Sequence, residues 1–378
     1  MQYMLIGADL VPTKSNIELF AAGNTRELLG EELKQLLQNA QYRVFNLEVP
    51  LTDKAEPIKK AGPNLIAPVN TINAYKDMEI DLLTLANNHI LDQGEQGFIS
   101  TIQALDNAQI AHVGGASNLR EAAKPYVFEL FGKMIGVYAC AEHEFTIASD
   151  SHCGANPFDL LESPDHVAAL KAECDYVIVL YHGGKEHYRY PSPMLQKVCR
   201  KLVDKGANLV VCQHSHCVGC EELYHGGTIV YGQGNFVFDN EDNEFWNTSI
   251  LIKVDETLQI GYIPLLKAKN GVRVAKGPLA DEILKGFDVR SAEIQQPGFI
   301  EKKYASFAET MISGYLISCG GRRSILERVI NRLSGGCYSR FKACVRYGKT
   351  HDVMAIRNYI ECEAHRELFL EGLRERTK

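Results

Sequence analysis

Short apolar runs alternate with longer amphipathic stretches through the first 275 residues of the chain. The runs have the length of buried strands, and the stretches repeat their apolar positions at the three- and four-residue spacing of helices. This alternation predicts an α/β fold with a largely parallel sheet and crossover helices. The predicted strands are 4–7, 43–46, 82–86, 135–140, 176–181 and 209–212. The predicted helices between them are 16–39, 95–108, 164–172 and 193–205.

The pattern changes twice in the second half of the chain. Residues 228–231, 248–254 and 259–263 are short alternating runs separated by Gly, Asn and Asp, which predicts antiparallel strands that close the sheet or form a second one. From residue 276 onward the apolar positions follow helical spacing, for example at Ile325, Val329 and Leu333. We therefore expect a 1–275 domain followed by a helical C-terminal extension, 276–378.

The composition narrows the classes of protein that fit. The chain has 378 residues, 46% hydrophobic and 23% charged, as globular proteins do, and no apolar run is long enough for an integral membrane segment or a signal peptide. Its 11 cysteines are odd in number and scattered, which favours reduced thiols and a cytoplasmic location. The net charge of −7 argues against a nucleic-acid surface.

The charge is unevenly distributed along the chain. From Cys319 onward there are 13 Lys and Arg against 7 Asp and Glu, a net charge of +6, which leaves −13 for the preceding residues. A basic tail is compatible with an anionic partner, including a membrane surface. The alternative is a set of solvated helix faces, because acidic residues are interleaved with the basic ones.

Metal-competent side chains follow five of the predicted strands. The loops at the carboxyl ends of parallel strands converge on one crevice, so we expect these side chains to meet there. A single strand-end carboxylate or histidine usually caps a helix or binds a loop, but five sets in register indicate a site. The residues are Asp9, Glu48, Asn88 with His89, His182, and His214 with His216.

A mixture of carboxylate, amide and imidazole donors suits Mn, Fe or Zn. Two such cations that share a carboxylate can activate a water and stabilise both reacting oxygens at phosphorus. Cys212 to Cys220, with the two histidines between them, permits an alternative zinc site. Lys185, Arg189 and Tyr190 follow His182 and are candidate substrate-binding residues for an anionic group, with a solvated loop as the equal alternative.

Ordered motifs then point to a family. Several short segments, taken in order along the chain, resemble the motifs of the CapA capsule and poly-γ-glutamate synthesis proteins. The segments are Gly7-Ala-Asp9, Asn46-Leu-Glu48, Ala86-Asn-Asn-His89 with Leu91-Asp92, Tyr181-His182-Gly-Gly, Tyr190-Pro-Ser-Pro193, His214-Ser-His216 and Gly234-Asn-Phe-Val-Phe-Asp239. That family is a branch of the calcineurin-like metallophosphoesterases. The resemblance runs from about Tyr3 to Asp239 and implies a metallophosphoesterase-like layered α/β/β/α sandwich.

The resemblance also implies roles for individual residues. Asp9 would bind a first divalent ion, Glu48 would bridge two ions, and Asn88 would offer its amide oxygen to the second. His182, His214 and His216 would complete the ligand shells. His89 would be the catalytic residue beside the metal, acting as a general acid or stabilising the transition state. Its alternative is a helix N-terminal histidine bonded to a loop carbonyl.

Two departures from the wider superfamily bear on activity. Metallophosphoesterases commonly carry Asp-x-His in the first motif, whereas Leu10 and Val11 follow Asp9 here, and Glu48 replaces an aspartate. Both departures match the CapA branch, and they leave a site with one or two ions. The leading interpretation is a metal-dependent hydrolase acting on a phosphoester or an anionic polymer precursor in capsule or exopolysaccharide production. The alternative is a non-catalytic scaffold that assembles with polymer synthetase subunits.

Overall fold

The computed structural model describes residues 2–239, 243–319, 325–338, 341, 354, 356–358, 360 and 363–375. Two compact units make up the chain, residues 1–300 and 301–378. The strands of the first unit are β1 (Tyr3–Leu10), β2 (Tyr42–Leu47), β3 (Leu82–Thr84), β4 (Ala111–Val113), β5 (Gly115–Ala116), β6 (Tyr126–Leu130), β7 (Lys133–Ala141), β8 (Gly154–Ala155), β9 (Tyr176–His182), β10 (Leu209–Gln213), β11 (Glu221–Tyr224), β12 (Gly227–Tyr231), β13 (Asn235–Val237), β14 (Thr248–Asp255), β15 (Ile260–Ala268) and β16 (Gly271–Val274). Its helices are α1 (Ile17–Ala21), α2 (Thr25–Asn39), η1 (Val69–Thr71), α3 (Ile72–Asp77), α4 (Gly94–Ala108), α5 (Leu119–Ala122), α6 (Glu162–Glu173), α7 (Pro193–Asp204), η2 (Glu244–Asn247) and α8 (Gly277–Glu293).

The first sheet is built around β1, whose eight residues are all buried. The strand order is β16-β15-β14-β1-β2-β3-β4, and β13 also pairs with β1. Strands β1 to β4 run parallel, while β14, β15 and β16 are antiparallel to their neighbours. The parallel half therefore brings the ends of β1, β2 and β3 to one edge of this sheet.

The second sheet has the order β11-β12-β10-β9-β7-β6. Its four central strands run parallel, and β11 and β6 are antiparallel at its two edges. Strands β9 and β10 lie in register, with Gln213 opposite His182. Their carboxyl ends therefore meet at one edge of the second sheet.

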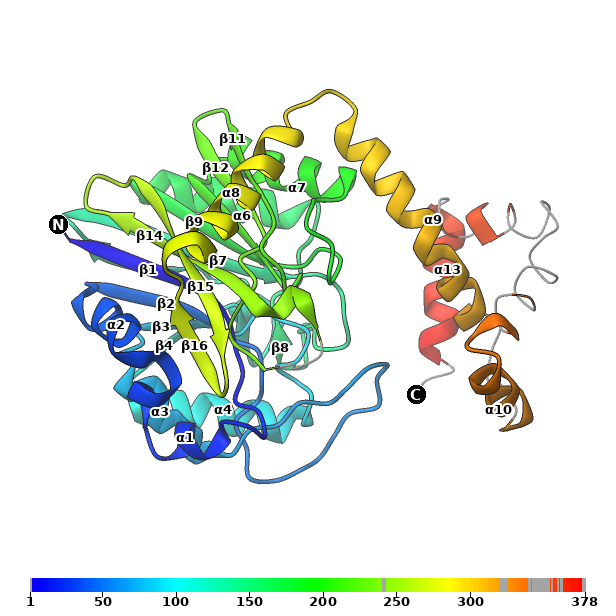
Figure 1. Ribbon diagram of the computed structural model, residues 1–378, viewed down its shortest axis with the longest axis horizontal. Coiled ribbons are helices and arrows are strands. Elements are labelled where there is room, and N and C mark those ends of the chain that lie inside the picture. Colours follow the sequence, from blue (N-terminus) through cyan, green and yellow to red (C-terminus); the bar gives the residue numbers. More distant parts are fainter. Residues whose placement is uncertain are drawn as a thin grey trace. The chain divides into compact units, whose positions relative to one another are not determined.

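Alternate residues of the second sheet face opposite layers. In β9, Ile178 and Leu180 belong to the core that contains the first sheet, whereas Val177 and Val179 pack with residues of α6 and α7. Helices α1 to α4 contribute to the core of the first sheet, and Figure 1 shows them on the side away from the second sheet. The layers are therefore helix, sheet, sheet, helix. The expected metallophosphoesterase-like α/β/β/α sandwich is confirmed.

Two details differ from the sequence prediction. Residues 228–231 were expected to be antiparallel, but β12 runs parallel to β10 and is antiparallel only to β11. Four of the five residues of β12 are buried, and a short apolar run does not reveal from the sequence whether its neighbours run parallel or antiparallel. The predicted helix 16–39 is divided into α1 and α2 by a turn at Gly23, whose φ of 65° is left-handed.

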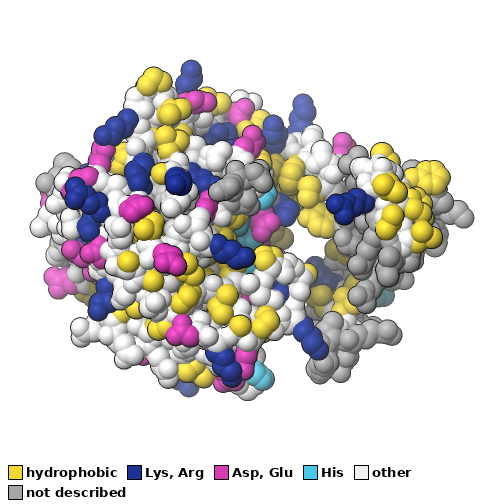
Figure 2. Space-filling model, turned by 60° about the horizontal axis from the view of Figure 1, so that its bottom comes forward, with side chains coloured by type: hydrophobic (Ala, Val, Ile, Leu, Met, Phe, Trp, Pro, Cys, Tyr) yellow, Lys and Arg dark blue, Asp and Glu magenta, His cyan; other side chains and the backbone are white. Residues whose placement is uncertain are grey.

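Most described residues of the second unit, 301–378, are helical, and residues 334–336 form a turn. It contains most of α9 (Phe299–Cys319), together with α10 (Ile325–Leu333) and α13 (Glu363–Glu375). The domain boundary that the sequence predicts at 275 stays a prediction, and helix α8 contacts β11 and β15 of the first unit. Within the described part of the chain, no helix has both the length and the apolar character to cross a membrane. On the face shown in Figure 2, basic and acidic side chains of the first unit are interspersed.

Gly7 allows β1 and β2 to pack closely just before the site. A Cβ at this position would lie 2.0 Å from Cε1 of the buried Phe45 ring, so Gly7→Ala has to displace that ring. We expect the variant to lose about 2 kcal/mol of unfolding free energy, as overpacked cores do. Urea unfolding followed by circular dichroism measures this loss.

The matched control is Gly261→Ala in β15, because a Cβ there meets nothing within 4 Å. Its unfolding free energy should stay within about 0.5 kcal/mol of the wild type. Equal losses in the two variants would show that the Phe45 contact is not the cause.

Candidate metal centre

The metal-competent side chains come from facing ends of the two sheets. Asp9 lies in β1, and Glu48 directly follows β2 in the first sheet. His182 ends β9, and His214 and His216 follow β10 in the second sheet. The sequence pattern alone suggested one sheet edge, whereas the crevice lies between two sheets. The structure brings together all six predicted metal ligands, the sixth being Asn88.

The loop after β10 has an unusual backbone. His214 has a φ of 82° and His216 a φ of 54°, both in the left-handed region that non-glycine residues rarely adopt. Both side chains are more than nine-tenths buried. A strained backbone that turns two histidines into one crevice is typical of a functional site.

One group of donor atoms gathers around His216. Its Nδ1 lies 3.5 Å from Oδ2 of Asp9 and 2.8 Å from Oδ1 of Asn235. Asp9 and Asn235 are neighbours because β13 pairs with β1 in the register Asp9 to Asn235. Donor atoms of Asp9, Glu48 and His216 all lie within 4.8 Å of one another.

A second group gathers around Nε2 of His182. This nitrogen lies 3.2 Å from Oε1 of Glu48, 3.2 Å from Nδ1 of His214 and 3.0 Å from Oδ1 of Asn88. Donor atoms of Glu48, His182 and His214 again lie within 4.8 Å of one another. Glu48 therefore belongs to both groups.

The buried carboxylates lack the hydrogen bonds that such groups normally have. Both side-chain oxygens of Glu48 and Oδ2 of Asp9 have no hydrogen-bond donor, although both residues are fully buried. An ionised carboxylate in this position is costly unless a cation compensates it. The residues present therefore fit divalent metal ions.

Asn46, which sequence reasoning left without a role, holds the Asp9 carboxylate in place, and Asn87 supports Asn46. Nδ2 of Asn46 donates to Oδ1 of Asp9 at 2.8 Å and lies 3.2 Å from Nδ1 of His182. Oδ1 of Asn46 accepts from Thr84 and from Asn87. Partners of this kind fix the orientation of metal-binding side chains.

His89 is positioned by Asp92 and by a lysine that nothing in the sequence distinguished. Nδ1 of His89 lies 2.5 Å from Oδ2 of Asp92, and Lys60 forms an ion pair with Oδ1 of the same carboxylate. Lys60 also donates to the backbone carbonyl of Asn88 at 3.3 Å, and its side chain is only 2% exposed. Nδ1 is also 3.2 Å from Nζ of Lys60, but the shorter distance to Asp92 identifies the carboxylate as the partner of the ring. In the sequence, Lys60 resembles any surface lysine.

The three predicted substrate-binding residues are placed differently from one another. Lys185 lies close enough to contribute to lowering the pKa of His214. Arg189 donates to the carbonyl of Val218 at 3.1 Å and lies over the Phe245 ring, and Tyr190 donates to Glu293 at 2.5 Å. Contact of any of the three with a substrate stays a prediction.

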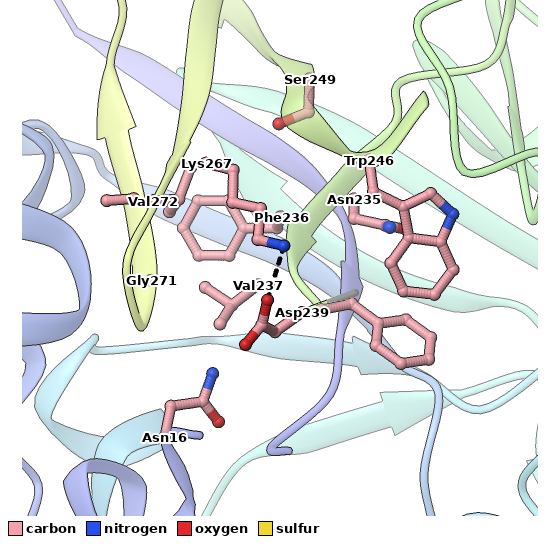
Figure 3. A pocket seen from close by; sticks show the side chains of 12 residues that line it. Asn16, Asn235, Phe236, Val237, Asp239, Trp246, Ser249, Lys267, Gly271 and Val272 are labelled. Carbon is pink, nitrogen blue, oxygen red and sulfur yellow. Dashed lines mark ion pairs between the residues drawn. The ribbon is translucent and has the colours of Figure 1, made fainter. Parts of the chain in front are cut away.

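Aromatic side chains flank His216. The sequence motifs include Phe238 but not Trp246. The Trp246 ring centroid is 4.6 Å from the His216 ring centroid, and the Phe238 ring meets His216 edge-on. Figure 3 shows Asn235 beside the Trp246 indole, in a pocket that also holds the ion pair between Asp239 and Lys267 (2.7 Å). These rings restrict the orientation of the His216 imidazole.

The alternative zinc site at the cysteines is not supported. Within the part of the chain that the structure describes, the two donor groups contain no cysteine. Cys212 and Cys220 instead pack in the apolar core beneath α6 and α7. Burial raises the pKa of the Cys220 thiol, which disfavours the thiolate that binds zinc.

Electrostatic interactions give the three histidines different pKa values. Burial opposes the charged ring of His216, but the nearby carboxylates of Asp9 and Glu48 outweigh burial and raise the pKa to about 9. Burial likewise opposes charge on His182, and Glu48 nevertheless raises its pKa. Burial and the neighbouring His182 both lower the pKa of His214 well below its usual value. The positive charge thus sits beside the two carboxylates.

A family model matches residues 9–240, which include every residue of both donor groups. Its description is "Bacterial capsule synthesis protein PGA_cap". The chain belongs to this family. The family assignment agrees with the CapA resemblance of the strand-end motifs, and the matched residues lie within the first unit.

Curated relatives give the same picture. The chain is 32% identical over 212 residues to the capsule biosynthesis protein CapA of Bacillus anthracis, covering 54% of this chain and 52% of that protein. It is 29% identical over 216 residues to the PGA biosynthesis protein CapA of Bacillus subtilis (strain 168), covering 55% and 56%. The chain thus spans about half the length of the curated relatives it matches.

Two solved structures are similar at low sequence identity. A hypothetical protein from Thermus thermophilus matches with a TM-score of 0.47 at 12% identity, covering 71% of this chain and 100% of that chain. A novel phosphatase from Mycoplasma pneumoniae matches with a TM-score of 0.43 at 14% identity, covering 70% and 93%.

The raised pKa of His216 predicts a pH-dependent metal affinity. Below about pH 9 the ring carries a proton that a metal ion has to displace. We expect Mn²⁺ affinity at this group to rise about tenfold per pH unit between pH 7 and 9 and to level off above that range. Calorimetric titration in buffers of different ionisation enthalpy detects the released proton. His216→Ala should lower the number of protons released and leave the release from His182, which Glu48 keeps protonated against the effect of burial. A pH-independent affinity in the wild type would contradict the assignment.

Because Lys60 pairs with the buried Asp92, we expect substitution of this one lysine to lower the unfolding free energy strongly. Lys60→Met leaves the fully buried Asp92 carboxylate without its cation, so we expect a loss of about 3 kcal/mol in unfolding free energy. The control in the same loop is Lys54→Met, whose pair with Glu56 is exposed and should contribute less than about 1 kcal/mol. Similar losses in the two variants, measured by urea unfolding, would argue against the buried pair.

Proposed function

We propose that this site binds two divalent metal ions and hydrolyses a phosphoester or an anionic polymer precursor in capsule or exopolysaccharide production. The observation that carries the proposal is the sharing of Glu48 between two donor groups, with both of its oxygens buried and without a hydrogen-bond donor. A carboxylate that only stabilised the fold would be hydrogen-bonded. Mn²⁺, Fe²⁺ and Zn²⁺ all suit the mixed donor set.

The proposed ligands divide between two ion positions. Asp9 and His216 hold the first ion, and Asn88, His182 and His214 hold the second. Glu48 contributes to both positions. Ions bound there would lower the pKa of a water and stabilise negative charge on the attacking and leaving oxygens.

His89 is proposed as the catalytic residue that transfers a proton. Its Nδ1 is hydrogen-bonded to Asp92, so Nε2 is the nitrogen that can exchange a proton with a substrate. When both nitrogens are protonated, the ring carries a positive charge that Asp92 stabilises through Nδ1. Nε2 then donates its proton to the leaving oxygen, and the ring becomes neutral. Lys60 supports this arrangement by neutralising the buried Asp92.

The substrate class is inferred from the family and from the charges around the crevice. The two curated relatives are named for capsule and PGA biosynthesis, which associates the family with anionic polymers. Lys185, Arg189 and Tyr190 are proposed to meet the anionic part of the substrate. Arg189 retains further N–H groups beyond the one directed at Val218. Polymer synthetase subunits are the proposed protein partners.

A scaffold function is the second candidate, and one observation favours it. The imidazole that usually follows the first aspartate is replaced by Leu10 and Val11, both buried. A weakened first metal position would leave a protein that holds the fold and binds partners without turnover. The arrangement of His89 with Asp92 favours the enzyme, because a scaffold has no need of an oriented proton donor.

The deciding experiment combines metal analysis with hydrolysis of an aryl phosphomonoester and diester. We expect about two transition-metal ions per wild-type chain, and loss of both metal and hydrolysis in the double variant His214→Ala, His216→Ala. His89→Gln should keep its metal and lose about 10²- to 10⁴-fold in kcat, since it removes only the proton transfer.

Three results separate the candidates. Metal in the wild type without hydrolysis of any ester favours the scaffold. Undiminished hydrolysis in His89→Gln would remove His89 from the mechanism. A wild-type protein that takes up no divalent ion under any loading condition would refute the metal centre.

A further inference from the structure

The first ion position has fewer donors than the second. Asp9, Glu48 and His216 form one group, whereas Glu48, His182 and His214 are joined by the amide of Asn88 in the other. The missing imidazole after Asp9 accounts for the difference. A further donor would have to come from a part of the chain that lies next to Asp9.

Strand β13 supplies a residue at that place. It runs parallel to β1 with Asn235 in register with Asp9, so the two side chains emerge on the same face of the sheet. The preceding Gly234 has a φ of 76°, and a Cβ there would lie 2.6 Å from the carbonyl oxygen of Thr248. This tight approach fixes the start of β13 and thereby the position of Asn235.

The distances around His216 match the edges of a metal coordination sphere. Two ligands that are each about 2.1 Å from one ion lie about 3.0 to 3.4 Å apart at the usual coordination angles. The Nδ1 atom of His216 is 2.8 Å from Oδ1 of Asn235 and 3.5 Å from Oδ2 of Asp9, values that bracket this range. Asn235 and Asp9 therefore approach the same nitrogen.

The second ion position shows the same arrangement. There, Nε2 of His182 is 3.0 Å from the amide oxygen of Asn88 and 3.2 Å from the Glu48 carboxylate. Each position thus has an imidazole nitrogen with an amide oxygen and a carboxylate oxygen around it. From this correspondence we infer that Asn235 is a metal ligand, which completes the Asp9 position through its amide oxygen.

The inference rests on the proposed metal centre and adds an expectation about which metal ion each position selects. An amide oxygen is a harder donor than the imidazole it would replace, so the Asp9 position should prefer Zn²⁺ over Mn²⁺ less strongly than the His182 position does. The competing interpretation makes Asn235 a positioning residue, which accepts Nδ1–H of His216 while the ring binds metal through Nε2. Nδ1 is the nitrogen that faces Asp9, which favours the ligand.

The test uses Mn²⁺ and three variants of the full chain. Asn235→Leu removes the donor at similar size, and Asn235→Asp keeps an oxygen donor. Asn16→Leu is the matched control, because Asn16 is also a buried amide in the pocket around Asn235 and lies outside both donor groups. Circular dichroism melting establishes that each variant is folded.

We expect two Mn²⁺ ions per chain in the wild type, Asn235→Asp and Asn16→Leu by equilibrium dialysis. Asn235→Leu should bind one of the two at least about 100-fold more weakly, because a lost ligand costs more than a lost orienting partner. Trp246 is the only tryptophan of the chain and lies beside His216, so Mn²⁺ quenching of its fluorescence reports on this position. Quenching should persist in Asn235→Asp and disappear in Asn235→Leu at Mn²⁺ concentrations that saturate the wild type.

A crystal structure of the Mn²⁺-loaded wild type decides between ligand and positioning residue without any variant. An Asn235 oxygen within about 2.5 Å of the ion supports the inference, and coordination through Nε2 of His216 with Asn235 on Nδ1 overturns it. Two tightly bound ions in a folded Asn235→Leu also overturn it, while the proposed function stands. No Mn²⁺ in the wild type refutes the proposed metal centre together with the inference.

Discussion

The burial of Glu48 is the constraint on which the rest of this structure depends. A carboxylate with no donor on either oxygen is unfavourable in an apolar interior, and its cost has to be offset by neighbouring groups. His182 partly does so, since its pKa is raised chiefly by this carboxylate against the effect of burial. The sandwich must therefore keep β2 and β9 in a fixed relation, although they belong to different sheets. Packing of the inner faces of the two sheets supplies that rigidity.

A hydrogen-bonded frame of amides transmits this rigidity to the side chains. Asn46 links Asp9 with Asn87 and Thr84, so strands β1, β2 and β3 are connected at the level of the site. These hydrogen bonds hold the donor atoms close together before any ion binds. The donor atoms repel one another, and this repulsion lowers the unfolding free energy of the metal-free protein. Ion binding relieves that repulsion, so folding and metal binding are thermodynamically coupled at this site.

The sequence predicted the strand ends well because each one combines two signals, an apolar run and a polar residue directly after it. Asp9, Glu48, His182, His214 and His216 all carry both signals. Lys60 carried neither, and its burial follows from the path of a long loop that local patterns do not encode. Asn46 and Asn235 stand within the quoted motifs, but neither was given a role, because an amide beside apolar residues has no distinctive chemical signature. The direction of β12 depends on pairing with a distant strand, and local alternation is insensitive to such pairing.

The left-handed backbone at His214 and His216 lowers the stability of the fold, while it turns both imidazoles into the metal centre. Glycine adopts such angles without strain, whereas histidine does not. Glycine at either position would relax the backbone, but it would also leave a cavity where the buried ring was, and at position 216 it would leave the Asp9 carboxylate without its imidazole partner. Selection for resistance to heat alone therefore has no simple way to change this turn, because backbone strain and the charges of the site favour different residues. This short turn is therefore the place where the evolutionary cost of the function is concentrated.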